Sequence, residues 1–157
     1  MTTTTTPAEQ NATAALARIF GLYDLDRVAQ SVPMELSTLN FEAREVLSDN
    51  DWNPAEMSEP YELHDHVSQA AYELPLSIEY RARWTAGTTP TDPDSFEIWL
   101  SVGGPSCWID GDFGLHGVPS ADSISLQYSW GPSDCGRLSL SDHEREALSW
   151  FVEMVAV

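Results

Sequence analysis

The clearest pattern in the chain is FEIWLSVGGPSCWIDGDFGLHGVPSADSISLQYSW, residues Phe96 to Trp130. Apolar residues alternate with polar ones from Phe96 to Val102 and again from Ser123 to Trp130. A period of two is typical of a strand with one buried and one solvated face. Turn-forming residues separate these runs, at Gly103-Gly104-Pro105 and over residues 111–119. Successive strands are therefore predicted to pair antiparallel.

The same alternation occurs upstream, from Pro75 to Trp84, and a short strand is expected at Cys107–Asp112. Together these runs predict a four-stranded antiparallel meander. A sheet of this kind cannot bury its apolar face alone. We therefore expect an α+β fold, in which the N-terminal helices and a C-terminal helix pack on one face of the sheet.

Helix signals lie on both sides of the predicted sheet. Thr6-Pro7-Ala8-Glu9 has the composition of a capped helix start, and Ser141-Asp142-His143-Glu144 forms a capping box. Gly21 is expected to end the first helix, and Phe41 to point inward from the third. The predicted helices are residues 7–20, 24–30, 40–47, 63–73 and 141–156.

One α+β domain is predicted over residues 7–157, with a mainly helical part (7–74), the sheet (75–130) and the C-terminal helix (141–156). Residues 1–6, which include a threonine run, are predicted to be a disordered N-terminus. Residues 131–136 are expected to form a loop.

Charge is the unusual property of this sequence: 25 Asp and Glu stand against seven basic residues, for a net charge of −18. Such a surface repels nucleic acid and anionic membranes, and it favours basic partners. Two interpretations stay open. The acids serve solubility or adaptation to a salty cytoplasm, or they imitate a phosphate backbone.

The compartment is predicted to be the cytoplasm. The N-terminus is polar, and no apolar run approaches the roughly 20 residues of a membrane span. Cys107 and Cys135 are the only cysteines, and we expect them to be reduced and partly buried.

No catalytic residue, metal site or cofactor is expected. His64 and His66 diverge on a helix and lack further ligands at a zinc spacing, so they are interpreted as surface or helix-start histidines. Asp110, Asp112 and His116 would suit an acid–base site. However, the glycines around them indicate a hairpin turn, where Asp is common for backbone reasons.

Four segments resemble a family of small proteins carried by phages, plasmids and integrated elements. They are PLSIEYRARW, FEIWLSVGGPSCWIDGDF, GVPSADSISLQYSWGP and LSLSDHEREALSWFVEMV, within Pro75–Val155. The resemblance rests on the Gly-Gly-Pro, Gly-x-Pro and Trp-Gly-Pro turns and on the C-terminal acidic helix; residues 1–74 fall outside it. It implies a mobile-element context, in which small acidic proteins often inhibit host defence, as anti-CRISPR or antirestriction proteins do.

Our leading hypothesis is a non-enzymatic inhibitor that binds a basic nucleic-acid-binding surface of a host defence complex as a DNA mimic. The alternative is an acidic adaptor or structural module, as a homodimer through Trp99 and Trp108. A small enzyme using Asp110, Asp112 and His116 is a third hypothesis. Alternation places both tryptophans on the polar face of the sheet, and exposed Trp is enriched at binding hot spots. The candidate partner-binding residues are Asp49, Asp51, Glu56, Glu59, Glu62, Asp92, Asp94, Trp99 and Trp108.

Overall fold

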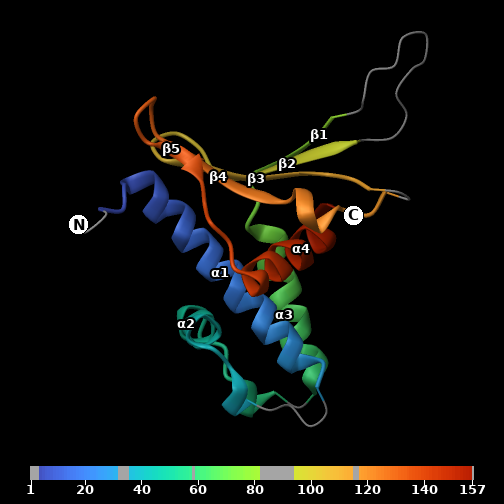
Figure 1. Ribbon diagram of the computed structural model, residues 1–157. Coiled ribbons are helices and arrows are strands. Elements are labelled where there is room, and N and C mark those ends of the chain that lie inside the picture. Colours follow the sequence, from blue (N-terminus) through green and yellow to red (C-terminus); the bar gives the residue numbers. More distant parts are fainter. Residues whose placement is uncertain (1–3, 32–35, 58, 82–93, 115–116, 157) are drawn as a thin grey trace.

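The computed structural model describes residues 4–31, 36–57, 59–81, 94–114 and 117–156 of the chain (Figure 1). In these ranges, four α-helices, three short 3-10 helices (η) and five strands make an α+β fold, which confirms the predicted class. In chain order they are α1 (Pro7–Ala29), η1 (Leu36–Thr38), α2 (Phe41–Asp49), η2 (Pro54–Glu56), α3 (Pro60–Glu73), β1 (Ser77–Arg81), β2 (Ser95–Ser101), β3 (Ser106–Asp112), η4 (Ala121–Ser123), β4 (Ser125–Ser129), β5 (Cys135–Arg137) and α4 (Asp142–Ala156).

The sheet is an antiparallel meander in the order β1-β2-β3-β4-β5. It has one strand more than predicted, because β5 falls in a segment that we expected to be a loop. β5 has only three residues and no alternation of apolar with polar side chains, so it carries no periodic signal. Backbone pairing with β4 creates it, through a turn in which Gly131 has a φ of 83°. The predicted end of the first strand, residues 82–84, lies outside the described residues.

One uninterrupted helix, α1, replaces the two that were predicted on either side of Gly21. Its start is as expected, since the Thr6 hydroxyl accepts a hydrogen bond from the Glu9 amide at 3.3 Å. Thr6 thus belongs to the helix cap rather than to a disordered N-terminus, while residues 1–3 lie outside the described part. Gly21 is buried where α2 crosses α1, and a Cβ there would lie 2.5 Å from the Glu42 carbonyl oxygen. The glycine therefore permits close helix packing and does not end the helix.

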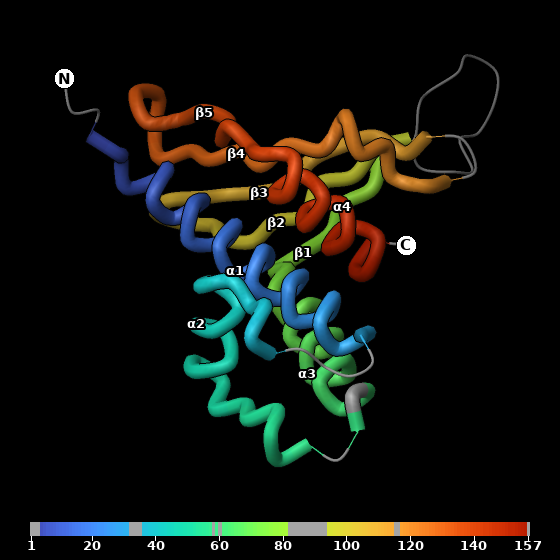
Figure 2. Tube along the Cα trace, turned by 60° about the horizontal axis from the view of Figure 1, so that its bottom comes forward, coloured from blue at the N-terminus to red at the C-terminus, as the bar shows by residue number. Residues whose placement is uncertain are grey.

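The helices form two layers beneath the sheet (Figures 1 and 2). α1 and α4 cover one face of the sheet, as predicted, whereas α2 and α3 pack against α1 on the side away from it. Only one N-terminal helix therefore covers the sheet. Apolar side chains from the sheet and the helices form one core, and its largest buried side chains include Phe96, Ile98, Ile109, Leu126, Ile19 and Phe151.

One hydrogen bond attaches the β4–β5 turn to α1, and a capping box begins α4. Asp134, in the β4–β5 turn, accepts a hydrogen bond from the Ala8 amide at 3.2 Å and so places a carboxylate at the positive start of α1. The predicted capping box of α4 is confirmed. Ser141 Oγ accepts from the Glu144 amide at 3.2 Å, and the Glu144 carboxylate accepts from the Ser141 amide at 2.9 Å.

Candidate protein-binding surfaces

The stretch with the most acids between two successive basic residues lies between Arg44 and Arg81, which enclose nine Asp and Glu and no Lys or Arg. We call residues 45–65 of this region the acidic segment. It comprises the end of α2, η2 and the first turns of α3, at the end of the molecule remote from the sheet (Figure 2). Its exposed carboxylates are Glu45, Asp49, Asp51, Glu56, Glu59 and Asp65, and Glu62 is half-buried.

A defined helix end holds the first part of the acidic segment. After α2, Asp51 adopts a left-handed conformation with a φ of 55°. Its amide donates to the Ser48 carbonyl at 3.2 Å, and the Trp52 amide donates to the Leu47 carbonyl at 3.0 Å. These two bonds are those of a Schellman motif, with Asp where Gly is more usual. The Asp51 carboxylate thus projects from a fixed turn.

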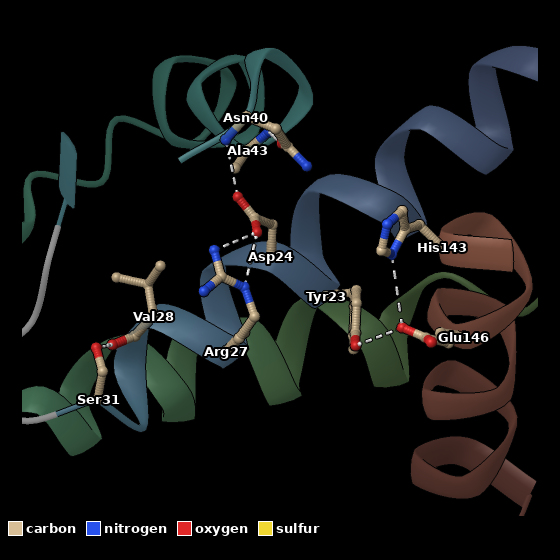
Figure 3. Close-up of polar contacts among 9 residues, drawn as sticks. All are labelled: Tyr23, Asp24, Arg27, Val28, Ser31, Asn40, Ala43, His143 and Glu146. Carbon is tan, nitrogen blue, oxygen red and sulfur yellow. Dashed lines mark hydrogen bonds and ion pairs between the residues drawn. The ribbon is translucent and has the colours of Figure 1, made fainter. Parts of the chain in front are cut away.

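The start of α2 is tied to α1 by the buried Asp24 (Figure 3). The Asp24 carboxylate accepts from the Asn40 amide at 2.8 Å and from the Arg27 guanidinium at 2.8 Å. Asn40 in turn caps α2, since its side chain accepts from the Ala43 amide at 2.8 Å. One buried aspartate therefore positions the helix that leads into the acidic segment.

An aromatic contact joins the two halves of the acidic segment. Trp52, between α2 and η2, stacks on His66 of α3 with ring centroids 5.4 Å apart and an interplanar angle of 26°. Trp52 also packs against the edge of the core. The exposed carboxylates on both sides of Trp52 are thus carried by a framework fixed at both ends.

Asp26, in contrast, has a buried carboxylate. It is 3% exposed and joins three helices. Its carboxylate accepts from the Trp150 indole of α4 at 3.0 Å and from the Gln30 side-chain amide at 2.9 Å, and it contacts His64 Nδ1 of α3. His64, whose side chain is 42% exposed near the start of α3, therefore also contacts a buried acid, a contact that the sequence did not predict. The missed signal was the position of Asp26 on the apolar face of an unbroken α1, four residues after Leu22.

The same histidine lies 3.4 Å from Ser68 Oγ through Nε2, so Asp26, His64 and Ser68 follow one another as in a hydrolase triad. The remaining requirement, amide donors for an oxyanion, is not met by α3, because the backbone amides around Ser68 are used within the helix. We interpret this line of contacts as a structural link between α1, α3 and α4.

Trp99 and Trp108 lie opposite each other on β2 and β3 and stack with ring centroids 4.7 Å apart. They share the face of the sheet that bears Asp110 and Gln127, which we call the open face, because no helix in the described part of the chain covers it (Figure 1). The predicted placement on the polar face is confirmed. Each ring is half-buried.

Two carboxylates of the open face, Glu97 and Asp110, are paired or hydrogen-bonded within the sheet. Glu97 pairs with Arg81 at 2.9 Å, and Asp110 accepts from Ser125 and Gln127 on the neighbouring strand. Asp112, from the same predicted acid–base cluster, is exposed, and His116 lies outside the described residues. The depression beside them, of about 310 Å³, is wide and shallow.

The structure thus separates the predicted partner-binding residues into distinct places. Five carboxylates belong to the acidic segment, and the two tryptophans lie on the open face, across α1 from it (Figure 2). Asp94 is exposed just before β2, distant from both, and Asp92 lies outside the described residues. A single partner contacting all of them would have to surround the molecule.

The two thiols differ. Burial raises the pKa of Cys107, which lies on β3 opposite Ser101 of β2, and no disulfide is formed. Cys135 is exposed on β5, contrary to the partial burial expected for both.

Within the described ranges, no three His, Cys, Asp or Glu side chains gather in a manner suited to a metal ion, and no helix has both the length and the apolar character needed to span a bilayer.

Comparison of the chain with protein-family models, with curated proteins and with solved structures finds no match.

Proposed function

We propose that this protein is a non-enzymatic inhibitor that binds a basic nucleic-acid-binding surface of a host defence complex and excludes the nucleic acid from it. The acidic segment is the element that makes this contact. Its carboxylates stand in for phosphates, which in duplex DNA supply one charge per about 1.7 Å of helix axis. An inhibitor of this kind acts in the cytoplasm, where such complexes meet invading DNA.

The observation that carries this proposal is the absence of internal compensation. Among the described residues, none of the ion pairs involves Asp49, Asp51, Glu56 or Glu59. These charges are therefore available to a partner, whereas Asp24, Asp26, Glu97 and Asp110 are already engaged by groups of the protein itself. Because the segment is anchored by Asp24, the Schellman turn and Trp52, its charges lose little conformational entropy on binding.

The test is inhibition of DNA binding by purified restriction and CRISPR complexes, with two charge-matched variants. Glu56→Lys/Glu59→Lys removes charge from the acidic segment, and Asp122→Lys/Glu153→Lys makes the same change at exposed sites elsewhere. We expect the first variant to weaken inhibition by about tenfold or more and the second by less than about twofold. Inhibition by the wild type should also weaken as NaCl rises, because screening reduces the attraction between opposite charges.

Equal losses in the two variants would show that net charge alone matters and would overturn the role of the acidic segment. A wild-type protein that inhibits none of the complexes would overturn the inhibitor proposal.

One observation favours a second function, that of an adaptor module which forms a homodimer. The stacked Trp99–Trp108 pair lies on a sheet face without a helical cover, and aromatic pairs are common in interface cores. Sedimentation velocity at increasing concentration tests this. A dimer that Trp99→Glu abolishes, and that Trp130→Glu at an exposed site beyond β4 leaves intact, would favour the adaptor.

A further inference from the structure

A groove of about 540 Å³ lies where α1, α2 and the ends of β2 and β3 meet. α1 forms its floor with one face of two helical turns, through Asn11, Ala14, Ala15 and Arg18. At a rise of 1.5 Å per residue this floor is about 10 Å long. The alanines leave only methyl groups there, so an incoming helix could approach α1 closely.

The walls of the groove offer apolar surface. Phe41, at the start of α2, was expected to point inward, but it is 71% exposed at the rim. Leu100 of β2 is half-buried on the opposite wall. An exposed phenylalanine beside a concave apolar surface is unusual in a monomer and is typical of a binding site.

The charge of the groove is acidic on one side. Glu42, Glu45 and Asp49 follow at helical spacing along α2 and all line it, whereas α1 contributes a single cation, Arg18. Three carboxylates against one guanidinium leave two negative charges in excess. The groove is therefore complementary to a segment that is apolar along one side and basic along the other, and it is unfavourable for an anionic small molecule.

We propose that this groove binds an amphipathic basic helix of the partner, with the apolar face of that helix on Phe41 and Leu100 and its Lys or Arg side chains against Glu45 and Asp49. The inference rests on the proposed function, because it identifies the element of the basic partner that is bound. Basic helices are also the elements with which many proteins contact DNA. A second copy of this chain is a poor occupant, since each copy carries a net charge of −18.

The probe is a fluorescein-labelled 14-residue peptide of Leu and Lys with its leucines at helical spacing, measured by fluorescence anisotropy in 0.15 M NaCl. A peptide of the same composition in scrambled order reports electrostatic attraction without an apolar face. On the protein, Ala14→Trp fills the groove, and Thr13→Trp adds the same bulk at an exposed position on α1 outside it. Phe41→Ala is a second groove variant, made at a side chain too exposed to be needed for folding.

We expect the amphipathic peptide to bind at least tenfold more tightly than the scrambled one. Ala14→Trp and Phe41→Ala should each weaken its binding at least fivefold, while Thr13→Trp leaves it within twofold. Equal binding of the two peptides, or equal binding by the Ala14→Trp and Thr13→Trp proteins, would overturn the groove as a helix site. Self-association of the unliganded protein that Ala14→Trp abolishes would assign the groove to a second copy and would equally overturn it.

Failure here and failure of the proposed function are distinguishable. Glu56 and Glu59 do not line the groove. If Ala14→Trp and Phe41→Ala leave peptide binding unchanged but Glu56→Lys/Glu59→Lys still relieves inhibition of a defence complex, the inhibitor proposal stands. Only the proposed helix site is then overturned.

Discussion

Asp26 of α1 and the exposed carboxylates of the acidic segment lie in adjacent helical layers and have opposite surroundings. Asp26 is 3% exposed and contacts groups from α3, α4 and its own helix. Asp51, Glu56 and Glu59 face solvent, and no ion pair to them occurs among the described residues. A buried carboxylate is tolerated only when it is paired and hydrogen-bonded, whereas an exposed one contributes little to stability.

This difference assigns separate roles to acids that look alike in the sequence. Asp24 and Asp26 hold α1, α2, α3 and α4 together. The exposed carboxylates of the acidic segment form no ion pairs with described residues of the protein, so a basic partner could bind them. Four experiments test this difference between buried and exposed groups.

Removal of the internal acid should have the largest effect. In Asp26→Ala, the Trp150 indole, the Gln30 side-chain amide and His64 lose the carboxylate that they contact. We expect the free energy of unfolding to fall by about 3 kcal/mol, as is typical when one partner of a buried pair is deleted. Urea denaturation followed by circular dichroism measures it. Asp65→Ala, at an exposed acid on α3, is the control and should change stability by less than about 0.5 kcal/mol; similar losses in both variants would erase the distinction.

The crossing of α1 and α2 should be nearly as sensitive. Gly21→Ala places a Cβ against the Glu42 carbonyl, at 2.5 Å before any adjustment, and would push away the helix that leads into the acidic segment. We expect a loss of about 2 kcal/mol from overpacking. In an exposed helix the same substitution would raise the free energy of unfolding by about 1 kcal/mol. The sign of the stability change, measured by thermal and urea unfolding, therefore distinguishes the two cases. A stabilised variant would show that the helices are not in close contact there.

Charge reversal in the acidic segment should have a small and opposite effect. Glu56→Lys/Glu59→Lys changes the net charge from −18 to −14 and lessens self-repulsion. We expect Tm to rise by about 2 °C in low salt and the gain to disappear near 0.5 M NaCl, where the Debye length is short. Calorimetry at both salt concentrations measures this. A lower Tm in the variant would mean that these side chains do support the fold.

The smallest effect concerns the two thiols, which repeat the contrast between buried and exposed groups. The pKa of Cys107 is raised by burial, so at any pH near neutrality less of it is thiolate, and its access to reagents is also limited. We expect iodoacetamide to modify Cys135 at least about tenfold faster than Cys107 in the native protein. Mass spectrometry of timed digests distinguishes them, and equal rates would indicate frequent opening of the core around Cys107.

Several features of the fold could be predicted because their signals are local. Alternation located β2, β3 and β4 to within a few residues, and the capping residues located the starts of α1 and α4. Other features could not be predicted, because their causes lie elsewhere in the chain. Gly21 is needed because α2 packs closely against α1 at that position. The strand β5 exists because it pairs with β4, and Phe41 is exposed because it lines an open groove.

The candidate site divides in the same way. The exposed acids of the acidic segment were evident from the sequence, since charge and turn formers mark a solvated segment. Their separation from Trp99 and Trp108 was not evident, because it depends on α1 lying between them. The groove beside Phe41 needed three elements from distant parts of the chain.

Composition and local pattern alone specified an acidic α+β protein with an antiparallel meander and capped helices, since period, charge and capping act over a few residues. Only the folded chain assigned each carboxylate to the interior or to the surface, because burial depends on which helices cross and which strands pair. Asp26 shows the physical reason. Its burial is sustained by donors on Trp150 and His64, which come near it only when α1, α3 and α4 are packed together.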